Sequence, residues 1–356
     1  MPTRNSRSAT SINEGNGLRG TGYGAMLQMK LRLALVDFSD GEAELCHRAL
    51  GRLSGLSVDA IVHRDHAICD QIGARFELPE RFYSLPQLLD SAMEAVDAVL
   101  IHGPRADRQQ LVRQALEAGK HVLVQSPWAT ALRDAASLMA LADQQRRQLM
   151  VGGVDRYRPS VQAIQQAARS GQLGMPVLLR MHDWRPPDPS QGSIWDRATD
   201  LLDTACWLFD AVPTDIAVLG QPQSTGAGEP PDFLQIHLGF PPQGMALLSV
   251  ANGLPAGAGY RCVTLIGSSG AAYADDHDQM QLLLQGGAAT ARRAGEELAT
   301  MTTQLREFQR AVHCGERPET KCEGCGLAIE LTDTAMRAWS IGQPVRFERT
   351  GHGSRT

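Results

Sequence analysis

Three aspartates in the segment 196–209 have a spacing that could support acid–base chemistry. On a helix, Asp196, Asp200 and Asp203 lie along one face, so their carboxylates cluster. Without a neighbouring cation, such a cluster raises the pKa of at least one member, because like charges disfavour the ionised form. Asp200 could then accept a proton in a reaction. The alternatives are a solvated helix face and a patch that accepts a metal ion.

A second candidate position follows a short apolar run in GKHVLVQSPWAT, residues 119–130. His121–Val124 has the pattern of a buried strand, and Pro127 ends it. This pattern alone predicts only a junction between a strand and a loop. Ser126 at this junction is uncharged and is a poor general base unless it has a partner.

The first half of the chain alternates short apolar runs with amphipathic stretches, which predicts a Rossmann-like parallel sheet with crossover helices. The clearest helix spans about 106–118, and Gly119 follows it at the C-cap position. The expected strands are Leu31–Val36, Val58–Val62, Ala98–Ile101, His121–Val124 and Leu149–Val151.

The second half has closely spaced strand-like runs, divided by turns such as PPQG (241–244) and GSSG (267–270). Close spacing implies hairpins, so an α/β unit with a largely antiparallel sheet is expected. Two helices, at about 296–313 and 325–340, should cover one face of this sheet. The expected strands are Val177–Met181, Phe233–Leu238, Met245–Val250, Cys262–Ile266 and Met280–Leu284.

The length of 356 residues suits two domains. We expect a disordered tail or a mis-assigned start at 1–28, a Rossmann-like domain at 29–150, a second α/β domain at 151–348, and a tail at 349–356. The net charge of −5 argues against nucleic acid and acidic membranes as partners, and no apolar run could span a bilayer. Seven scattered cysteines favour a reduced, cytoplasmic setting.

Four segments resemble motifs of the Gfo/Idh/MocA oxidoreductases, a family that includes glucose-fructose oxidoreductase and inositol dehydrogenase. Residues 119–130 resemble its Glu-Lys-Pro segment, and VGGVDRYRP (151–159) resembles the opening of its second domain. GQLGMPVLLR (171–180) is similar to its turn into a strand, and DRATDLLDTACWLF (196–209) is similar to its Asp/His helix. The resemblance covers nearly all of 29–348 and implies a small sugar-like or polyol ligand and a homo-oligomer formed through the C-terminal sheet.

The resemblance also implies an NAD(P) cofactor, whose diphosphate needs a glycine-rich turn after the first strand. Asp37, Ser39 and Glu42 fall at the three glycine positions, give or take one residue. A carboxylate there repels a diphosphate, and side chains occupy its space. Gly41 could restore one tight turn but not the whole glycine-rich loop that binds the diphosphate.

Two further loops belong to the implied cofactor site. His63 and Arg64 follow the second strand. Arg64 is either a solvated loop charge or a ligand for a 2′-phosphate. In the second case, any dinucleotide binding that this chain retains would favour NADP. The loop after the next strand holds His102, Gly103, Pro104, Arg105 and Arg108. Its positive charge lies close to Asp37 and Asp40, which indicates either internal neutralisation by ion pairs or a different anionic ligand.

In the family a Lys, an Asp and a His converge on the nicotinamide. Gln125, Ser126 and Pro127 stand at the Glu-Lys-Pro positions, Asp200 stands at the His position, and Asp196 and Asp203 are kept. Arg156 and Tyr157 match a substrate-side pair, with core packing as the alternative for Tyr157. No metal site is expected, because only Cys322 and Cys325 have ligand spacing near His313.

The sequence therefore predicts a divergent NAD(P)-dependent oxidoreductase homologue that acts on a sugar, cyclitol or similar polyol. The competing prediction is a non-catalytic member that binds a metabolite or serves as a partner or regulatory subunit. Loss of the Lys, the His and three glycines together favours the second class on chemical grounds, since fold alone does not determine activity.

Overall fold

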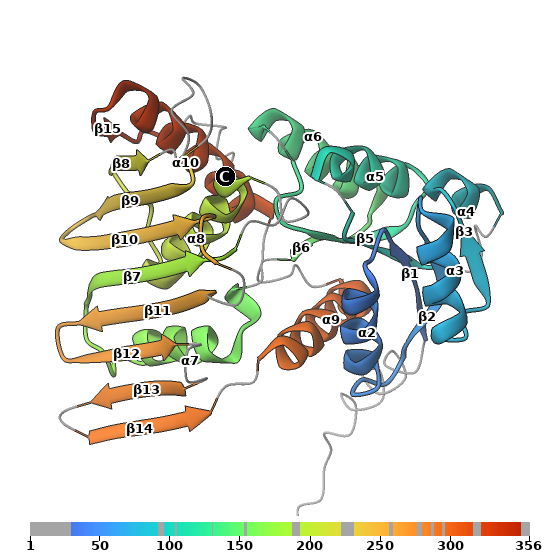
Figure 1. Ribbon diagram of the computed structural model, residues 1–356, viewed down its shortest axis with the longest axis horizontal. Helices are drawn as coiled ribbons and strands as arrows, with labels where there is room; N and C mark the ends of the chain where they lie inside the picture. The colour runs from blue at the N-terminus through green and yellow to red at the C-terminus, as the bar shows by residue number, and fades with distance from the viewer. Residues whose placement is uncertain are drawn as a thin grey trace, which may run out of the picture.

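The computed structural model contains two β-sheets that lie side by side, each accompanied by helices (Figure 1). The predicted class, a Rossmann-like parallel sheet and a largely antiparallel sheet, is confirmed. The expected tail at 1–28 and all but the first residue of 349–356 lie outside the described residues. The described residues are 30–91, 96–103, 105–129, 131–152, 155–186, 193–221, 231–255, 259–275, 280–285, 288–293, 296–315 and 322–349.

The first sheet has six parallel strands in the order β3-β2-β1-β4-β5-β6. Strand order reverses between β1 and β4, and ligands of such sheets bind beyond the carboxyl ends of the strands at this point. Each predicted strand is present, with ends that differ by up to two residues. The strands are β1 (Leu31–Val36), β2 (Leu56–Val62), β3 (Glu80–Phe82), β4 (Ala98–Ile101), β5 (His121–Gln125) and β6 (Leu149–Gly152).

Helices cover both faces of this sheet: α2 (Asp40–Leu50), α3 (His66–Arg75), α4 (Leu85–Ser91), α5 (Arg105–Glu117) and α6 (Leu132–Gln145). The helix predicted at 106–118 is α5. It ends where Gly119 takes a φ of +69°, a conformation that glycine adopts without steric cost. Lys120 N then donates to Ala115 O at 2.9 Å, which closes the last turn of the helix.

The second sheet has nine strands in the order β14-β13-β12-β11-β7-β10-β9-β8-β15. Among the strands that the structure describes, only β7 and β10 of this sheet pair in parallel, and the turns predicted at 241–244 and 267–270 join antiparallel hairpins. The strands are β7 (Pro176–Trp184), β8 (Asp215–Gln221), β9 (Phe233–Phe240), β10 (Gly244–Ala251), β11 (Tyr260–Gly267), β12 (Gly270–Asp275), β13 (Met280–Gln285), β14 (Ala288–Arg293) and β15 (Val345–Arg346).

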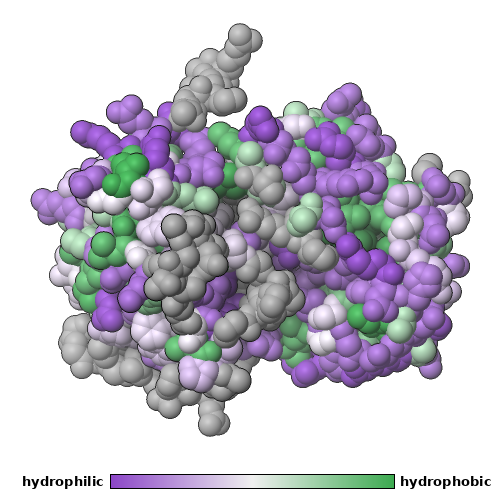
Figure 2. All heavy atoms as spheres, turned by 45° about the horizontal axis from the view of Figure 1, so that its top comes forward, coloured by the Kyte–Doolittle hydropathy of each residue, from purple (hydrophilic) through white to green (hydrophobic). Residues whose placement is uncertain are grey.

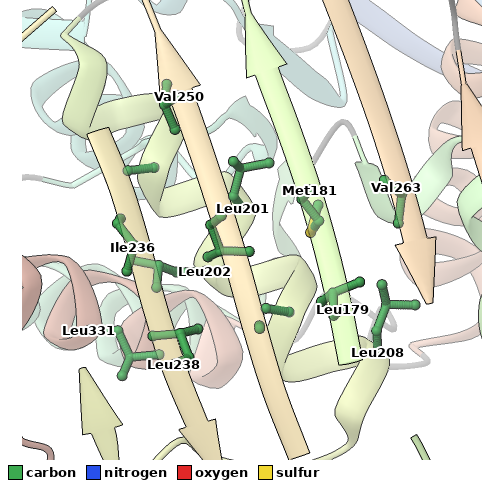
Figure 3. Packing of buried hydrophobic residues seen from close by; sticks show 14 of the residues in the cluster. Leu179, Met181, Leu201, Leu202, Leu208, Ile236, Leu238, Val250, Val263 and Leu331 are labelled. Carbon is green, nitrogen blue, oxygen red and sulfur yellow. The ribbon is translucent and has the colours of Figure 1, made fainter. Parts of the chain in front are cut away.

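One face of the second sheet packs against α7 (Pro159–Arg169), α8 (Ile194–Phe209) and α10 (Cys322–Ile341), whereas α9 (Glu297–Cys314) does not join this core. Figure 3 shows the packing of strand side chains such as Leu179, Met181 and Ile236 with leucines of α8 and with Leu331 of α10. Truncating one of these buried leucines to alanine would cost about 2–5 kcal/mol. This core fixes α8, and therefore Asp200, relative to the sheet.

The position of α9 corrects the expectation that both C-terminal helices cover the second sheet. Its apolar residues, including Leu305 and Phe308, pack instead with Ala43 and Cys46 of α2 (Figure 1). Gln309 Nε2 also donates to Ser54 O at 2.8 Å. The amphipathic pattern correctly predicted a buried face on α9, but that face completes the core beside the parallel sheet.

The surface is mainly polar on the side that Figure 2 shows, where hydrophobic residues form small separate groups. Within the ranges that the structure describes, no helix is long and apolar enough to cross a membrane.

Candidate functional site at the carboxyl edge of the parallel sheet

The loop between β1 and α2 forms the first wall of the site. Asp37 takes a φ of +53°, Phe38 is buried, and Ser39 is the N-cap of α2. Glu42 Oε2 accepts hydrogen bonds from Ser39 N at 3.0 Å and from Ser39 Oγ at 2.8 Å. Ser39 Oγ in turn accepts from Glu42 N at 3.4 Å, which completes a capping box. Two of the three residues at the expected glycine positions, Ser39 and Glu42, therefore satisfy the end of α2 themselves.

His102, which follows β4, closes the same corner. Its Nδ1 lies 3.1 Å from Glu42 Oε1, and its ring lies 4.2 Å from the Phe38 ring, centroid to centroid. Partial burial would raise the pKa of Glu42, but hydrogen bonds and charge from His102, together with hydrogen bonds from Ser39, lower that pKa to about 2. Glu42 therefore carries a negative charge at neutral pH.

Arg64 bridges two acids at the mouth of this corner. Its Nη2 donates to Asp37 Oδ2 at 2.9 Å and to Asp107 Oδ2 at 2.7 Å. The hydrogen bonds to these two carboxylates raise the pKa of Arg64. The arginine thus binds two carboxylates of this chain, which take the place of the 2′-phosphate that the sequence allows as its ligand. His63 turns back into its own loop, where its Nδ1 accepts from Asp65 N at 3.0 Å.

Ion pairs do neutralise Asp37 and Asp40, but with partners other than those that the sequence suggested. Asp37 pairs with Arg64, and Asp40 pairs with Arg75 at 2.6 Å. The expected partners were His102, Arg105 and Arg108, of which His102 pairs with Glu42. Pro104 and the side chain of Arg105 lie outside the described part of the chain.

The geometry at α2 does not fit a dinucleotide diphosphate in the family's position. A Cβ added to Gly103 would lie 2.8 Å from the Asp37 Cβ, so the Asp37 side chain already packs against this backbone. The N-terminus of α2, which would bind the diphosphate, is capped by a charged Glu42. Binding would require loss of the capping box and displacement of two carboxylates.

Gln125 ends β5 on the same face of the parallel sheet as Leu123, the face that packs with α9. A Cβ added to Gly152 of β6 would meet the side chains of both Gln125 and Gln304 of α9. Gln125 therefore lies against β6 and α9, and glycine at 152 is what allows this close approach. Its predicted role in cofactor binding remains a proposal.

Ser126, one residue beyond β5, contacts Asp200 of α8. The Ser126 side chain hydrogen-bonds the Asp200 carboxyl group, which joins the end of the parallel sheet to the second half of the chain. Burial raises the pKa of Asp200 to about 7, although the Ser126 hydrogen bond and the charge of Arg261 oppose the rise. Asp155 and Asp203 raise it further through like-charge repulsion. The predicted rise in pKa within the aspartate cluster therefore falls on Asp200.

The other two aspartates of α8 are committed to structural contacts. Asp196 is buried, and its Oδ2 accepts from Ser193 N at 2.7 Å in the capping box that starts α8. Asp203 accepts two hydrogen bonds from Arg156, at 2.6 and 2.5 Å. This bidentate pair places the Arg156 guanidinium 5.5 Å from the Trp207 ring centroid. Arg156 and Asp203 thus neutralise each other.

Tyr157 is buried, with 2% of its surface exposed, and it packs in the core that contains Leu305 and Phe308 of α9. The packing interpretation of Tyr157 agrees with this position. A direct role in substrate binding would require this core to open.

Two further charged residues of the site were missed from the sequence. Arg261 of β11 lies 2.5 Å from Asp155, whose side chain is 1% exposed. Burial opposes ionisation, but Asp155 and Asp183 raise the pKa of Arg261 and keep it charged. A signal was available: strand alternation places Arg261 on the same inward face as Val263 and Leu265, where an arginine needs an acidic partner.

Among the residues that the structure describes, no group of three or more His, Cys, Asp or Glu side chains could hold a metal ion. The side chains of Cys322 and Cys325 lie outside those residues.

Comparison with known proteins agrees with this architecture. Residues 31–153 match a family model described as an oxidoreductase family with an NAD-binding Rossmann fold. The oxidoreductase YceM of Salmonella typhimurium is 35% identical over 124 residues, which are 34% of this chain and 39% of the relative. Inositol 2-dehydrogenase of Corynebacterium glutamicum is 25% identical over 189 residues, covering 52% of this chain and 54% of the relative. The chain thus spans roughly two fifths to half of the length of these two relatives.

A solved structure extends the likeness over both sheets. An oxidoreductase from Agrobacterium radiobacter, crystallised with NAD+, L-tartaric acid and magnesium, has a TM-score of 0.76 at 17% identity, covering 89% of this chain and 98% of that one. At this identity the likeness establishes the fold. The two sheets and the family match define a Rossmann-type oxidoreductase homologue. Residues 31–153 match the model of the Gfo/Idh/MocA family, the family that the motifs of this chain resemble.

Proposed function

We propose that this chain is a non-catalytic member of the family that binds a sugar, cyclitol or similar polyol near Ser126 and Asp200. In this proposal the chain does not hold a nicotinamide dinucleotide at α2. The observation that carries the proposal is the capping box between Ser39 and Glu42, since it places a carboxylate at the helix end that would receive the diphosphate.

The electrostatic energies indicate that Glu42 repels a diphosphate more strongly than the N-terminus of α2 attracts it. A carboxylate about 4 Å from one phosphate charge is unfavourable by about 4 kcal/mol at an effective dielectric constant of 20. A helix N-terminus contributes up to about 2 kcal/mol toward binding an anion. Because Glu42 stays ionised at neutral pH, the attraction of the helix end does not offset this repulsion.

Titration of the purified protein with NADH and with NADPH, followed by nicotinamide fluorescence, tests this proposal. We expect no saturable binding of either cofactor up to millimolar concentration. Glu44→Gln is the matched control for substitutions of Glu42, because Glu44 also lies on α2 but pairs with Arg75 away from the capping box. Saturable micromolar binding by the wild-type protein would overturn the proposal.

Ser126 and Asp200 provide the chemistry expected of a site for hydroxyl groups. Near neutral pH, Asp200 is present both as an acid that can donate and as a carboxylate that can accept a hydrogen bond. The name of the inositol 2-dehydrogenase relative also supports a cyclitol-like ligand. Calorimetric titration with myo-inositol and with aldoses would test this choice, and Asp200→Ala should abolish any binding.

A divergent NAD(P)-dependent oxidoreductase is the second candidate, and the protonation of Asp200 favours it. A group with a pKa near 7 is suited to take a proton from a substrate hydroxyl at neutral pH. If a cofactor did bind, Arg64 would favour NADPH over NADH, provided that a 2′-phosphate displaced Asp37 and Asp107. Asp200→Asn should then lower turnover more than affinity, and unchanged turnover would remove Asp200 from that mechanism.

Self-association is proposed through the face of the second sheet that points away from α7, α8 and α10. Leu219, Phe233 and Met245 alternate with buried residues and are 66%, 38% and 50% exposed. Apolar side chains exposed on an open sheet face are typical of an interface between subunits. A second copy of the chain is the proposed partner.

A further inference from the structure

Arg108 of α5 lies between two loops at the carboxyl edge of the parallel sheet. Its Nε donates to His102 O at 3.0 Å and to Gly103 O at 2.8 Å, in the loop that follows β4. Its Nη1 donates to the carbonyl oxygens of the segment that follows β5, at 3.3, 2.8 and 3.2 Å. These acceptors are Gln125 O, Ser126 O and Pro127 O.

Only an arginine side chain suits this arrangement. The guanidinium group carries five N–H donors in a fixed planar fork, so one side chain can reach carbonyl groups on two separate loops. A lysine in the same place would present one compact ammonium group and could not span both loops. The helix therefore supplies donors for carbonyl groups at the carboxyl ends of β4 and β5.

The shortest hydrogen bond from Arg108 to the second loop is the 2.8 Å bond to Ser126 O. From the other side, Ser126 N donates to Gly152 O at 3.2 Å. The Ser126 backbone is thus held by β6 through its N–H group and by Arg108 through its carbonyl group. The side chain of the same residue makes the contact with Asp200.

We propose that Arg108 is a positioning residue, which holds Ser126 so that its hydroxyl group remains in hydrogen-bond contact with Asp200. This inference rests on the proposed function, because it concerns the geometry of the proposed ligand site. It adds a residue that hydrogen-bonds the Ser126 backbone and acts through it.

The groups around Asp200 define a direct readout of this contact. Asp155 of the turn before α7, Asp203 of α8 and Arg261 of β11 act on Asp200 through charge, whereas Ser126 acts through a hydrogen bond that lowers the Asp200 pKa. Ser126→Ala should therefore raise the Asp200 pKa, by about half a unit to one unit for one lost hydrogen bond. This pKa can be measured by carbon NMR of the aspartate carboxyl groups in the full chain without any ligand.

The test is a double-mutant cycle between positions 108 and 126. If Arg108 acts through Ser126, Arg108→Ala raises the Asp200 pKa in the wild-type chain and causes no further change when Ser126 is already alanine. If Arg108 acts only through its charge, it shifts the Asp200 pKa equally in both backgrounds, and the inference is overturned. No shift in the wild-type background also overturns it.

Two further variants keep the test decisive if Arg108→Ala folds poorly. Arg108→Lys retains the charge but not the fork, so it should still raise the Asp200 pKa. Arg113→Ala is the matched control on the same helix, since Arg113 contacts the exposed Ser137 at 3.1 Å and should leave the Asp200 pKa unchanged. Since no cofactor or polyol enters the measurement, its result is separate from the outcome of the NADH and NADPH titrations.

Discussion

Glu42 accepts hydrogen bonds from both the backbone N–H and the hydroxyl group of Ser39, and these bonds close the N-terminus of α2 with a carboxylate of the chain itself. In a Rossmann-type sheet this helix end faces the crevice where strand order reverses. The helix end that would bind a diphosphate therefore already has an anion. His102, which directly follows β4, contacts the Glu42 carboxylate from the other side of the crevice. The contact therefore joins the two sides of the crevice.

Glu42→Gln should lower the free energy of unfolding at pH 7, because the neutral amide accepts the capping-box hydrogen bonds more weakly than the carboxylate does. The loss should be about 1 kcal/mol, because solvent screens the pair of Glu42 with His102. The pKa of Glu42 is about 2 in the folded chain against 4.5 as a free side chain. A lowered pKa stabilises the fold above pH 4.5, and this contribution is lost as pH falls from 4.5 toward 2. Urea unfolding across this range measures it, with Glu44→Gln as control; equal pH profiles for wild type and Glu42→Gln would contradict the prediction.

Asp200 should give the opposite dependence on pH. Its pKa is raised from 3.8 to about 7, so the folded chain keeps a proton that the unfolded chain releases within this window. Stability must then fall as pH rises from 3.8 to about 7, by on the order of 4 kcal/mol. Asp200→Asn should remove this slope and make the protein more stable at pH 8.

The control for Asp200 is Asp210→Asn, at the C-cap of the same helix, where asparagine also tolerates the left-handed conformation. Urea unfolding at pH 5 and pH 8 compares the three proteins. If Asp200→Asn keeps the wild-type slope, Asp200 is not the source of the pH dependence.

The ion pairs of Arg156 and Arg64 should differ in their contribution to stability. Arg156 and Asp203 are each 13% exposed, so Arg156→Ala leaves a poorly solvated carboxylate without its partner and should cost about 3–5 kcal/mol. The Arg64 side chain is 55% exposed, and Arg64→Ala should cost less than about 1 kcal/mol. Thermal and urea unfolding compare the two variants; equal losses would be inconsistent with the burial of the two pairs.

Met245→Asp should dissociate a dimer formed through the open face of the second sheet, because it places a charge among apolar side chains at the interface. Light scattering after size-exclusion chromatography measures the mass, and a dimeric wild type with a monomeric variant is expected. Met175→Asp is the control, because Met175 is 52% exposed and lies before β7, outside the strands of this face. A monomeric wild-type chain would rule out this partner.

Much of the fold follows from short-range patterns. The parallel strands are buried on both faces, so β1, β4 and β5 are largely apolar, and the sequence locates them to within a residue or two. Strand β3 was missed because it has three residues, two of them the exposed Glu80 and Arg81. The destination of α9 was also missed, since an apolar stripe shows that a helix is buried and does not show which core receives it.

The site was predictable where one helix carries it. Helical periodicity predicts that Asp200 lies near its neighbours on α8. The pairing of Arg64 with Asp37 and Asp107 instead joins two loops and the first turn of α5, which are far apart in sequence. The capping box left a readable signal, because a Ser followed three residues later by Glu is its usual pattern. These positions align with the glycine-rich turn of the family, and that alignment indicates a substitution without indicating a helix cap.

The most direct measurement compares NADPH and NADH binding by the wild-type chain with binding by the triple variant Asp37→Gly, Ser39→Gly, Glu42→Gly. The variant removes two carboxylates and the cap, and the φ of +53° at position 37 suits glycine. We expect nicotinamide fluorescence to detect no saturable binding by the wild-type chain and measurable binding by the variant, once circular dichroism shows that the variant is folded. Tight binding by the wild-type chain that the three substitutions leave unchanged would contradict the closure of this site by Ser39 and Glu42.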